Sequence, residues 1–289
     1  MKAVRAMVHG AVSILNAIPT GVGGALGVDL WTEAEARLID EPGRIRVSIP
    51  EGEDPRLAVE SAKAILEHAG GADLGLLIKT RSSIPIGKGL KSSSAASDAI
   101  ALAVAKLIGL QISDELIVEL AVKASIKAGV TITGAYDDAY TCFFGGVNVT
   151  DNQARKVLWR MDSPRDLDIL ILVPEGKLYT SSVSLEDLKK VKEICLRAAD
   201  LALRRKIWDA MTLNGLAIAA ALNLDMRPIL RALRAGAYAA GVSGTGPAIA
   251  AVAPPKRGEE VRKSLERFGP VISCKPNNSW ASWRMIGDE

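Results

Sequence analysis

The sequence contains few cysteines, and their positions exclude the cysteine-based classes of protein. Cys142, Cys195 and Cys274 are odd in number, scattered along the chain and without a C-x-x-C spacing. A disulfide framework needs paired cysteines and a zinc site needs clustered ones, so neither is expected. Reduced, buried thiols are the remaining interpretation, and they predict a cytoplasmic protein.

Long apolar runs and a strong net charge are also missing. The most apolar helical stretches carry Asp98 and Lys106, or Asn214 and Asn223, so none is expected to span a membrane. The N-terminus lacks the charged and then apolar pattern of a signal peptide. The formal net charge of +3 is too small to indicate a polyanion. We therefore expect neither a membrane nor a nucleic acid as partner.

What is present is an alternation of strand-like and helical segments over 289 residues, a length that favours two lobes. Periodicity and turn residues predict strands over 25–31, 45–49, 74–80, 167–173, 247–253 and 271–275. Helices are predicted over 56–69, 113–129, 208–222 and 227–240, with a long one beginning at Ser184. This order implies α+β lobes and not a doubly wound sheet. The polar stretch 151–165 predicts a boundary between lobes 1–162 and 163–289.

The most informative segment is the run Ile84 to Ser97, I-P-I-G-K-G-L-K-S-S-S-A-A-S. It follows a predicted strand and opens into an alanine-rich helix that runs to about residue 107. Its glycines allow tight turns and a close approach of a ligand to the backbone. The unpaired N–H groups and the positive dipole end of a helix N-terminus bind anions, and two lysines add positive charge. The segment therefore predicts a phosphate-binding loop.

The alternative for this run is an ordinary glycine-rich turn before a serine-capped helix. Proline, two spaced glycines, two lysines and three consecutive serines together favour phosphate binding over that alternative. The chain contains no G-x-x-x-x-G-K-[S/T] string, so the loop is not a Walker A loop. The run also lacks the G-x-G-x-x-G fingerprint of dinucleotide-binding folds.

Three motifs resemble those of the GHMP small-molecule kinases, and they occur in the expected order. The string P-I-G-K-G-L-K-S-S-S-A resembles the second motif, P-x-x-x-G-L-x-S-S-[A/S]. Residues 241–247, G-V-S-G-T-G-P, resemble the third motif, a second glycine-rich loop beside the first. Between them, G-A-Y-D-D-A at 134–139, followed by Gly145-Gly146, resembles the segment with the catalytic aspartate of mevalonate kinase-like members. The resemblance implies a ribosomal S5-like N-terminal lobe and a ferredoxin-like C-terminal lobe, with the site in the cleft between them.

Within the superfamily, the details most resemble the archaeal-type shikimate kinases. The pointers are the two lysines of G-K-G-L-K-S-S-S, the string T-G-A-Y-D-D-A and the N-terminal block S-I-L-N-A-I-P-T-G. One departure stands out. Many GHMP kinases begin with P-G-K, whose lysine helps the active site, whereas the comparable place here is His9-Gly10-Ala11. The role of that lysine is unfilled at its usual position, which counts against a mevalonate kinase or a galactokinase.

The resemblance also implies the site residues. The loop is expected to bind ATP, and the residues assigned to this are Pro85, Ile86, Gly87, Lys88, Gly89, Leu90, Lys91, Ser92, Ser93, Ser94 and Ala95. Ser92 or Ser93 is expected to reach Mg²⁺, and Ser93 is the residue assigned to the metal. The expected acceptor contacts are Asn16, Thr20, Thr245 and Gly246. Arg5, Arg81 and Lys275 are candidate cations, with an ordinary surface charge as the favoured alternative for each.

Asp137 is the predicted catalytic residue. It matches the aspartate of the family, whereas Asp138 falls where relatives often carry asparagine. A pair of carboxylates in a surface turn is the alternative. The flanking residues are mostly apolar, however, and carboxylates in such a segment need partners or a function.

Three functional hypotheses remain from the sequence. The favoured one is ATP-dependent phosphorylation of a hydroxyl of shikimate, with ATP and Mg²⁺ as cofactors. The second is another GHMP kinase activity, such as homoserine or mevalonate kinase. The third is an RNA-binding S5-like module, for which the basic run Arg204-Arg205-Lys206 is the support. That run follows a helix with interspersed acids and an apolar stripe, as in the solvated face of a core helix.

Overall fold

The computed structural model describes residues 2–49, 53–71, 73–176 and 184–287. Its larger sheet has seven strands, in the order β11-β1-β2-β4-β3, with β5 paired to β2 and β6 paired to β5. All pairs in it are antiparallel except β3 with β4. The strands are β1 (Ala3–Leu15), β2 (Val22–Ile39), β3 (Ile45–Ser48), β4 (Gly75–Ser82), β5 (Val147–Asp151), β6 (Lys156–Met161) and β11 (Ser282–Ile286).

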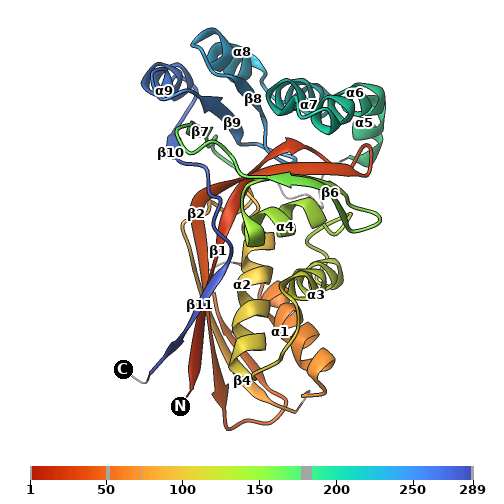
Figure 1. Ribbon diagram of the computed structural model, residues 1–289, viewed down its shortest axis with the longest axis vertical. Coiled ribbons are helices and arrows are strands. Elements are labelled where there is room, and N and C mark those ends of the chain that lie inside the picture. Colours follow the sequence, from red (N-terminus) through yellow and green to blue (C-terminus); the bar gives the residue numbers. More distant parts are fainter. Residues whose placement is uncertain (1, 50–52, 72, 177–183, 288–289) are drawn as a thin grey trace.

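Four helices cover one face of this sheet (Figure 1). They are α1 (Arg56–Ala69), α2 (Ser92–Leu107), α3 (Asp114–Lys127) and α4 (Tyr136–Phe144). The α3 helix begins where the Ser113 hydroxyl accepts a hydrogen bond from the amide of Leu116, at 3.2 Å. The α1 helix ends at Gly70, which has a φ of 69° that glycine adopts without strain. The bounds of these two helices were predictable because their ends have local signals.

A second, four-stranded antiparallel sheet forms the other lobe, in the order β10-β7-β9-β8. Its strands are β7 (Asp168–Leu172), β8 (Ala239–Val242), β9 (Ile249–Ala253) and β10 (Val271–Cys274). The helices of this lobe are α5 (Leu185–Lys190), α6 (Lys192–Leu203), α7 (Ile207–Ala221), α8 (Arg227–Arg234) and α9 (Gly258–Glu266). Figure 1 shows them gathered at the end of the molecule opposite the chain termini. The predicted α+β class is confirmed.

Several predicted elements were wrong in extent. The helix predicted over 227–240 ends at Arg234, and Ala239 and Ala240 lie fully buried in β8. The long helix from Ser184 is interrupted at Val191, which separates α5 from α6. The strand predicted over 25–31 is only the middle of the 18-residue β2. Alanine favours a helix, but pairing with β9 overrides that preference at Ala239 and Ala240.

The last part of the chain returns to the first sheet. The β11 strand pairs with β1, with Ala3 opposite Ile286, and the two chain ends lie near each other (Figure 1). Just before it, the Asn277 carbonyl accepts a hydrogen bond from the Gly146 amide, at 2.8 Å. A Cβ atom on Gly145 would lie 2.8 Å from the backbone of Asn278, so this glycine is needed for the chain to pass. The boundary at 162/163 stays a prediction. It assigns β11 to the C-terminal lobe, although β11 pairs with β1 in the first sheet.

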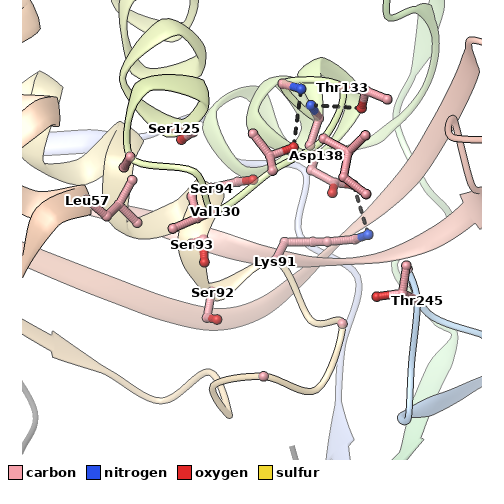
Figure 2. Close-up of a pocket in the computed structure, with 18 of the residues that line it drawn as sticks. Leu57, Lys91, Ser92, Ser93, Ser94, Ser125, Val130, Thr133, Asp138 and Thr245 are labelled. Carbon is pink, nitrogen blue, oxygen red and sulfur yellow. Dashed lines mark hydrogen bonds and ion pairs between the residues drawn. The ribbon is translucent and has the colours of Figure 1, made fainter. Parts of the chain in front are cut away.

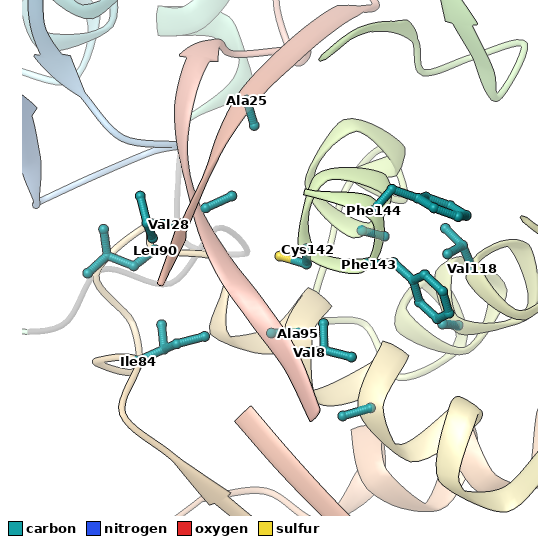
Figure 3. Packing of buried hydrophobic residues seen from close by; sticks show 14 of the residues in the cluster. Val8, Ala25, Val28, Ile84, Leu90, Ala95, Val118, Cys142, Phe143 and Phe144 are labelled. Carbon is teal, nitrogen blue, oxygen red and sulfur yellow. The ribbon is translucent and has the colours of Figure 1, made fainter. Parts of the chain in front are cut away.

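The main hydrophobic core lies between the first sheet and its helices and continues into the second lobe. Figure 3 shows Cys142, Phe143 and Phe144 of α4 on one side of the β1–β2 ribbon, with Ile84 and Leu90 on the other. A smaller core fills the space between the second sheet and its own helices. Among the described residues, no helix is both long and apolar enough to cross a membrane. The predicted burial of the three cysteines is confirmed.

Candidate active site

A cavity of about 360 Å³ lies where the two lobes meet. It is lined by the turn after β1, the start of α1, the loop before α2, the α3–α4 connection and the Gly244-Thr245 turn. Four of these five segments were singled out in the sequence: the N-terminal block, the glycine-rich loop, the aspartate segment and the third motif. The tertiary structure therefore brings the loop, the aspartate segment and the third motif into one site (Figure 2).

The loop before α2 is shaped by left-handed backbone conformations. Gly87, Gly89 and Lys91 have φ values of 69°, 77° and 66°. No side chain caps the helix that begins at Ser92, so the amide groups of its first turn have no side-chain acceptor. A helix N-terminus of this kind binds the oxygens of a phosphate group.

The third motif packs directly on this loop, as predicted. A Cβ atom on Gly89 would lie 2.0 Å from the carbonyl oxygen of Ser243, so only glycine fits there. The Ser243 hydroxyl donates to the Gly89 carbonyl at 2.7 Å, and the Ala248 amide donates to the Lys88 carbonyl at 3.2 Å. The two glycine-rich loops thus hold each other in place.

The residues assigned to nucleotide binding fall into two groups. Those that line the cavity are Ile86, Gly87, Gly89, Lys91, Ser92, Ser93 and Ser94. Leu90 and Ala95 are buried in the core, and Pro85 does not line the cavity. The ammonium group of Lys88 donates to the carbonyls of Pro174 and Gly176, in the other lobe. Leu90, Ala95 and Lys88 therefore build the loop, and their side chains are not placed to touch a ligand in the cavity.

Lys91 reaches across the cavity to the aspartate segment (Figure 2). Its ammonium nitrogen lies 2.9 Å from Oδ1 of Asp138 and donates to the Ser13 hydroxyl at 2.7 Å. The residue is only 8% exposed, which is unusual for a lysine. Sequence analysis placed Lys91 in the loop but did not foresee either partner.

Asp137 is almost completely buried and points to a different partner. Its Oδ1 accepts a hydrogen bond of 2.7 Å from the side-chain amide of Asn152, whose own Oδ1 accepts from the Asp137 amide at 3.2 Å. Burial and the neighbouring carboxylate of Asp138 raise the pKa of Asp137 to about 7, against the opposing effects of Lys91 and Asn152. A carboxyl group with this pKa can accept a proton near neutral pH.

The last turn of α3 and the connection from α3 to α4 add hydroxyl groups that sequence analysis missed. Ser125, Thr131 and Thr133 line the cavity. The Thr131 hydroxyl accepts from the Gly134 amide at 3.2 Å, and the Thr133 hydroxyl accepts from the Ala135 amide at 3.3 Å. The signal was the polar string T-I-T-G directly before the aspartate motif.

The predicted acceptor contacts are only partly brought together. Asn16 and Thr245 line the cavity, and the Asn16 amide donates to the Gly244 carbonyl at 2.9 Å. Thr20 does not line it, because its hydroxyl closes the turn before β2 through hydrogen bonds with Val22. Gly246 does not line it either.

The three candidate cations lie elsewhere. Arg5 pairs with Glu35 and Lys275 pairs with Asp168, and neither lines the cavity. Arg81, at the end of β4, does not line it. Within the described part of the chain, the cavity-lining cations are Lys91 and Arg56, which pairs with Asp54 at 2.6 Å.

A smaller and mainly apolar cavity of about 100 Å³ adjoins the main one. Ile49, Ile86, Ala58 and Ile100 line it, and it shares Leu57, Ser92 and Ser93 with the main cavity. Its position beside the start of α2 suits a flat, apolar group attached to a phosphate chain.

The donors near the loop can be compared with those that Mg²⁺ prefers. Among the described residues there is no cluster of three or more His, Cys, Asp or Glu side chains that could hold a metal ion. The hydroxyls of Ser92, Ser93, Ser94 and Ser125 do line the cavity beside the α2 N-terminus. Mg²⁺ bound to a nucleotide takes few protein ligands and keeps water and phosphate oxygens, so this hydroxyl set fits it.

Comparison with known proteins gives the class. The model of the GHMP kinases N terminal domain matches residues 56–146, and that of the GHMP kinases C terminal domain matches residues 187–271. The chain is similar to solved structures of homoserine kinase from Cytophaga hutchinsonii, with a TM-score of 0.78, 18% identity and 98% and 97% of the two chains covered. It is also similar to mevalonate kinase from Methanococcus jannaschii, with a TM-score of 0.76, 15% identity and 95% and 98% covered. Both structures show the shared fold.

The chain therefore belongs to the GHMP kinases. Among curated relatives, it is 39% identical to the shikimate kinase of Methanothrix thermoacetophila, over 92% of this chain and 91% of that protein. It is 38% identical to the shikimate kinase of Thermococcus kodakarensis, over 94% of this chain and 99% of that one. The superfamily and the fold expected from the three motifs are confirmed, as is the expected likeness to archaeal shikimate kinases.

Proposed function

We propose that this protein is an ATP-dependent kinase that transfers the γ-phosphoryl group to a ring hydroxyl of shikimate. The observation that carries the proposal is that the phosphate-binding loop and a buried carboxyl group with a pKa near 7 line one cavity. The chain is similar to curated shikimate kinases over more than 90% of its length, and this supports shikimate as the acceptor.

In this proposal the nucleotide lies along the start of α2. Its phosphates accept hydrogen bonds from the amides that begin the helix and from the hydroxyls of Ser92 to Ser94. Its base occupies the adjoining apolar cavity, against Ile49, Ile86 and Ile100. Ser93 would hold Mg²⁺, which would neutralise charge on the phosphates, and Ser125 lines the same cavity.

Asp137 acts as the general base in this scheme. The acceptor hydroxyl gives its proton to the Asp137 carboxylate, and the oxygen forms a bond to the γ-phosphorus. The bond from that phosphorus to the bridging oxygen of ADP breaks, and ADP leaves. The Asn152 amide holds the carboxylate in position. Asn16 and Thr245 are the proposed acceptor contacts, and Thr20 and Gly246 are no longer assigned to that role.

The experiment that tests this function uses purified protein, ATP, Mg²⁺ and a panel of shikimate, homoserine and mevalonate. ADP release and the phosphorylated product are measured for each acceptor. We expect product from shikimate, with the other two at least ~100-fold lower in kcat/KM because their shapes fill the pocket differently. Equal or greater turnover of homoserine or mevalonate would assign the other GHMP activity instead.

The RNA-binding alternative depends on the basic run Arg204-Arg205-Lys206, two of whose side chains contact neighbouring groups. Arg204 pairs with Asp200 at 3.1 Å, and the Arg205 guanidinium lies 5.0 Å from the centre of the Trp159 ring. These two side chains are thus occupied by neighbouring groups. The cytoplasmic location expected from the cysteines stays a prediction.

A further inference from the structure

Lys91 occupies a place that is unfavourable for a cation by itself. It is the N-cap residue of α2, where the helix dipole is positive and anions are preferred. Its backbone has a φ of 66°, a left-handed conformation that costs free energy for a residue with a side chain. A buried, strained lysine at a helix N-terminus is retained at a cost in stability, which suggests a function for its charge.

The partners of Lys91 fix its ammonium group but do not saturate it. The Nζ atom has Asp138 Oδ1 at 2.9 Å and Ser13 Oγ at 2.7 Å, and an ammonium group has three N–H donors. Among the described residues, the ammonium group donates a hydrogen bond to Ser13 and forms an ion pair with Asp138, so at least one donor remains. Gly244 approaches this nitrogen closely, since a Cβ atom on it would lie 3.2 Å from Nζ, and Lys91 also lines the main cavity.

The position of Ser13 connects this lysine to the gap noted in the first strand. Ala11 stands where many GHMP kinases carry the lysine of P-G-K, and Ala11 is fully buried in β1. Residues two apart in a strand face the same side of the sheet, so Ser13 lies on the face of Ala11, one pleat further along. The Lys91 side chain extends from the loop before α2 and places its ammonium group next to the Ser13 hydroxyl on this face.

We propose that Lys91 is a catalytic residue whose free N–H donor contacts an oxygen of the γ-phosphoryl group during transfer. This inference rests on the proposed kinase function and names the group that fills the missing lysine's role. Ser13 and Asp138 are positioning residues that hold the ammonium group between the α2 N-terminus and the aspartate segment. The charge on Lys91 stabilises the negative charge of the phosphoryl oxygens as ADP departs.

A purely structural role for Lys91 makes a different prediction. In that case the lysine only neutralises Asp138, and removal of both charges together would restore the enzyme. The decisive comparison is therefore between Lys91→Met, Asp138→Asn and the double variant. Lys106→Met is the matched control, because Lys106 lies on the same helix but over the Trp283 ring and outside the cavity.

The measurements are kcat and KM with the best acceptor, ADP affinity by calorimetry, and the thermal unfolding midpoint. We expect Lys91→Met to lower kcat at least ~100-fold, in line with loss of a charge at the transferred group. ADP affinity should change less than about threefold, since ADP lacks the γ-phosphate. The double variant should remain as slow as Lys91→Met, and Lys106→Met should match the wild type.

Two outcomes would overturn the inference: a kcat for Lys91→Met within threefold of the wild type, or recovery of kcat in the double variant. If Lys91→Met does not fold, Lys91→Arg and Ser13→Ala take its place, and an unchanged kcat in both variants overturns the inference equally.

The acceptor is chosen from the panel with wild-type enzyme, so an error in the proposed acceptor does not affect this comparison of variants. If the wild-type protein phosphorylates no acceptor, the proposed function is wrong, and the inference about Lys91 is wrong as well.

Discussion

The side-chain amide of Asn152 donates a hydrogen bond of 2.7 Å to Oδ1 of Asp137, between two residues that are both almost fully buried. This bond stabilises the ionised carboxylate, whereas burial and Asp138 stabilise the neutral acid. The balance sets the pKa of Asp137 near 7.

Asp137→Asn should lower kcat by ~100-fold or more and leave the fold and ADP affinity unchanged, because it removes a general base and keeps the side-chain shape. In the wild type, only the ionised carboxylate accepts a proton. The rate should therefore fall about tenfold per pH unit below pH 7 and level off above it. Steady-state kinetics between pH 5 and 9 check both statements. Near-normal turnover in Asp137→Asn would remove Asp137 from the mechanism.

Asn152→Ala should move the acidic limb of the pH–rate profile to higher pH. The Asn152 hydrogen bond lowers the pKa of Asp137, so its loss lets that pKa rise. Thr150→Val is the matched control: the Thr150 hydroxyl donates to Asn152 at 2.6 Å but does not touch Asp137. Profiles of the two variants are compared with the wild type. A limb that stays in place in Asn152→Ala would contradict the proposed role of the amide.

Asp98→Asn should stabilise the protein at neutral pH but not in acid. Asp98 is fully buried in α2, neither carboxyl oxygen has a hydrogen-bond partner among the described residues, and burial raises its pKa well above the usual value. At pH values between its ordinary and its raised pKa, the unfolded chain releases this proton and the folded chain keeps it. Asp98 therefore lowers the free energy of unfolding by ~1.4 kcal/mol per pH unit in that window.

The test is urea unfolding of Asp98→Asn and wild type at pH 4 and pH 7. The variant should gain stability relative to the wild type at pH 7 and differ little at pH 4, because asparagine resembles the neutral acid. A difference in unfolding free energy that is the same at both pH values would show that Asp98 does not titrate in this way.

Gly89→Ala should weaken ATP binding by at least ~10-fold, because its Cβ atom would meet the Ser243 carbonyl at 2.0 Å and push the two glycine-rich loops apart. Gly43→Ala is the control, since Gly43 has a similar φ of 70° and no atom within 4 Å of the added Cβ. Backbone strain of ~1 kcal/mol applies to both variants. Calorimetric ATP titration distinguishes them, and equal affinities would show that the contact between the loops is not needed for binding.

Much of the local structure could be predicted. The glycine stop at Gly70 and the serine cap at Ser113 set the ends of α1 and α3 through interactions within a few residues. The loop before α2 was also recognisable from local residues, because its glycines occupy positions with left-handed backbone conformations. Strands β1, β5, β6, β8 and β11 were missed. Two of them have partners far away in the chain, because β11 pairs with β1 and β5 pairs with β2.

The sequence by itself determined the phosphate-binding loop, the aspartate segment and the superfamily, because each depends on residue types at short spacing. Only the tertiary structure decided that Lys91 meets Ser13 and Asp138 while Lys88 turns to the other lobe. Both lysines lie in the same short loop, three positions apart, and both were assigned to nucleotide binding from the sequence. The direction of each side chain is decided by the partners packed around it, and those partners lie from 47 to 88 positions away along the chain.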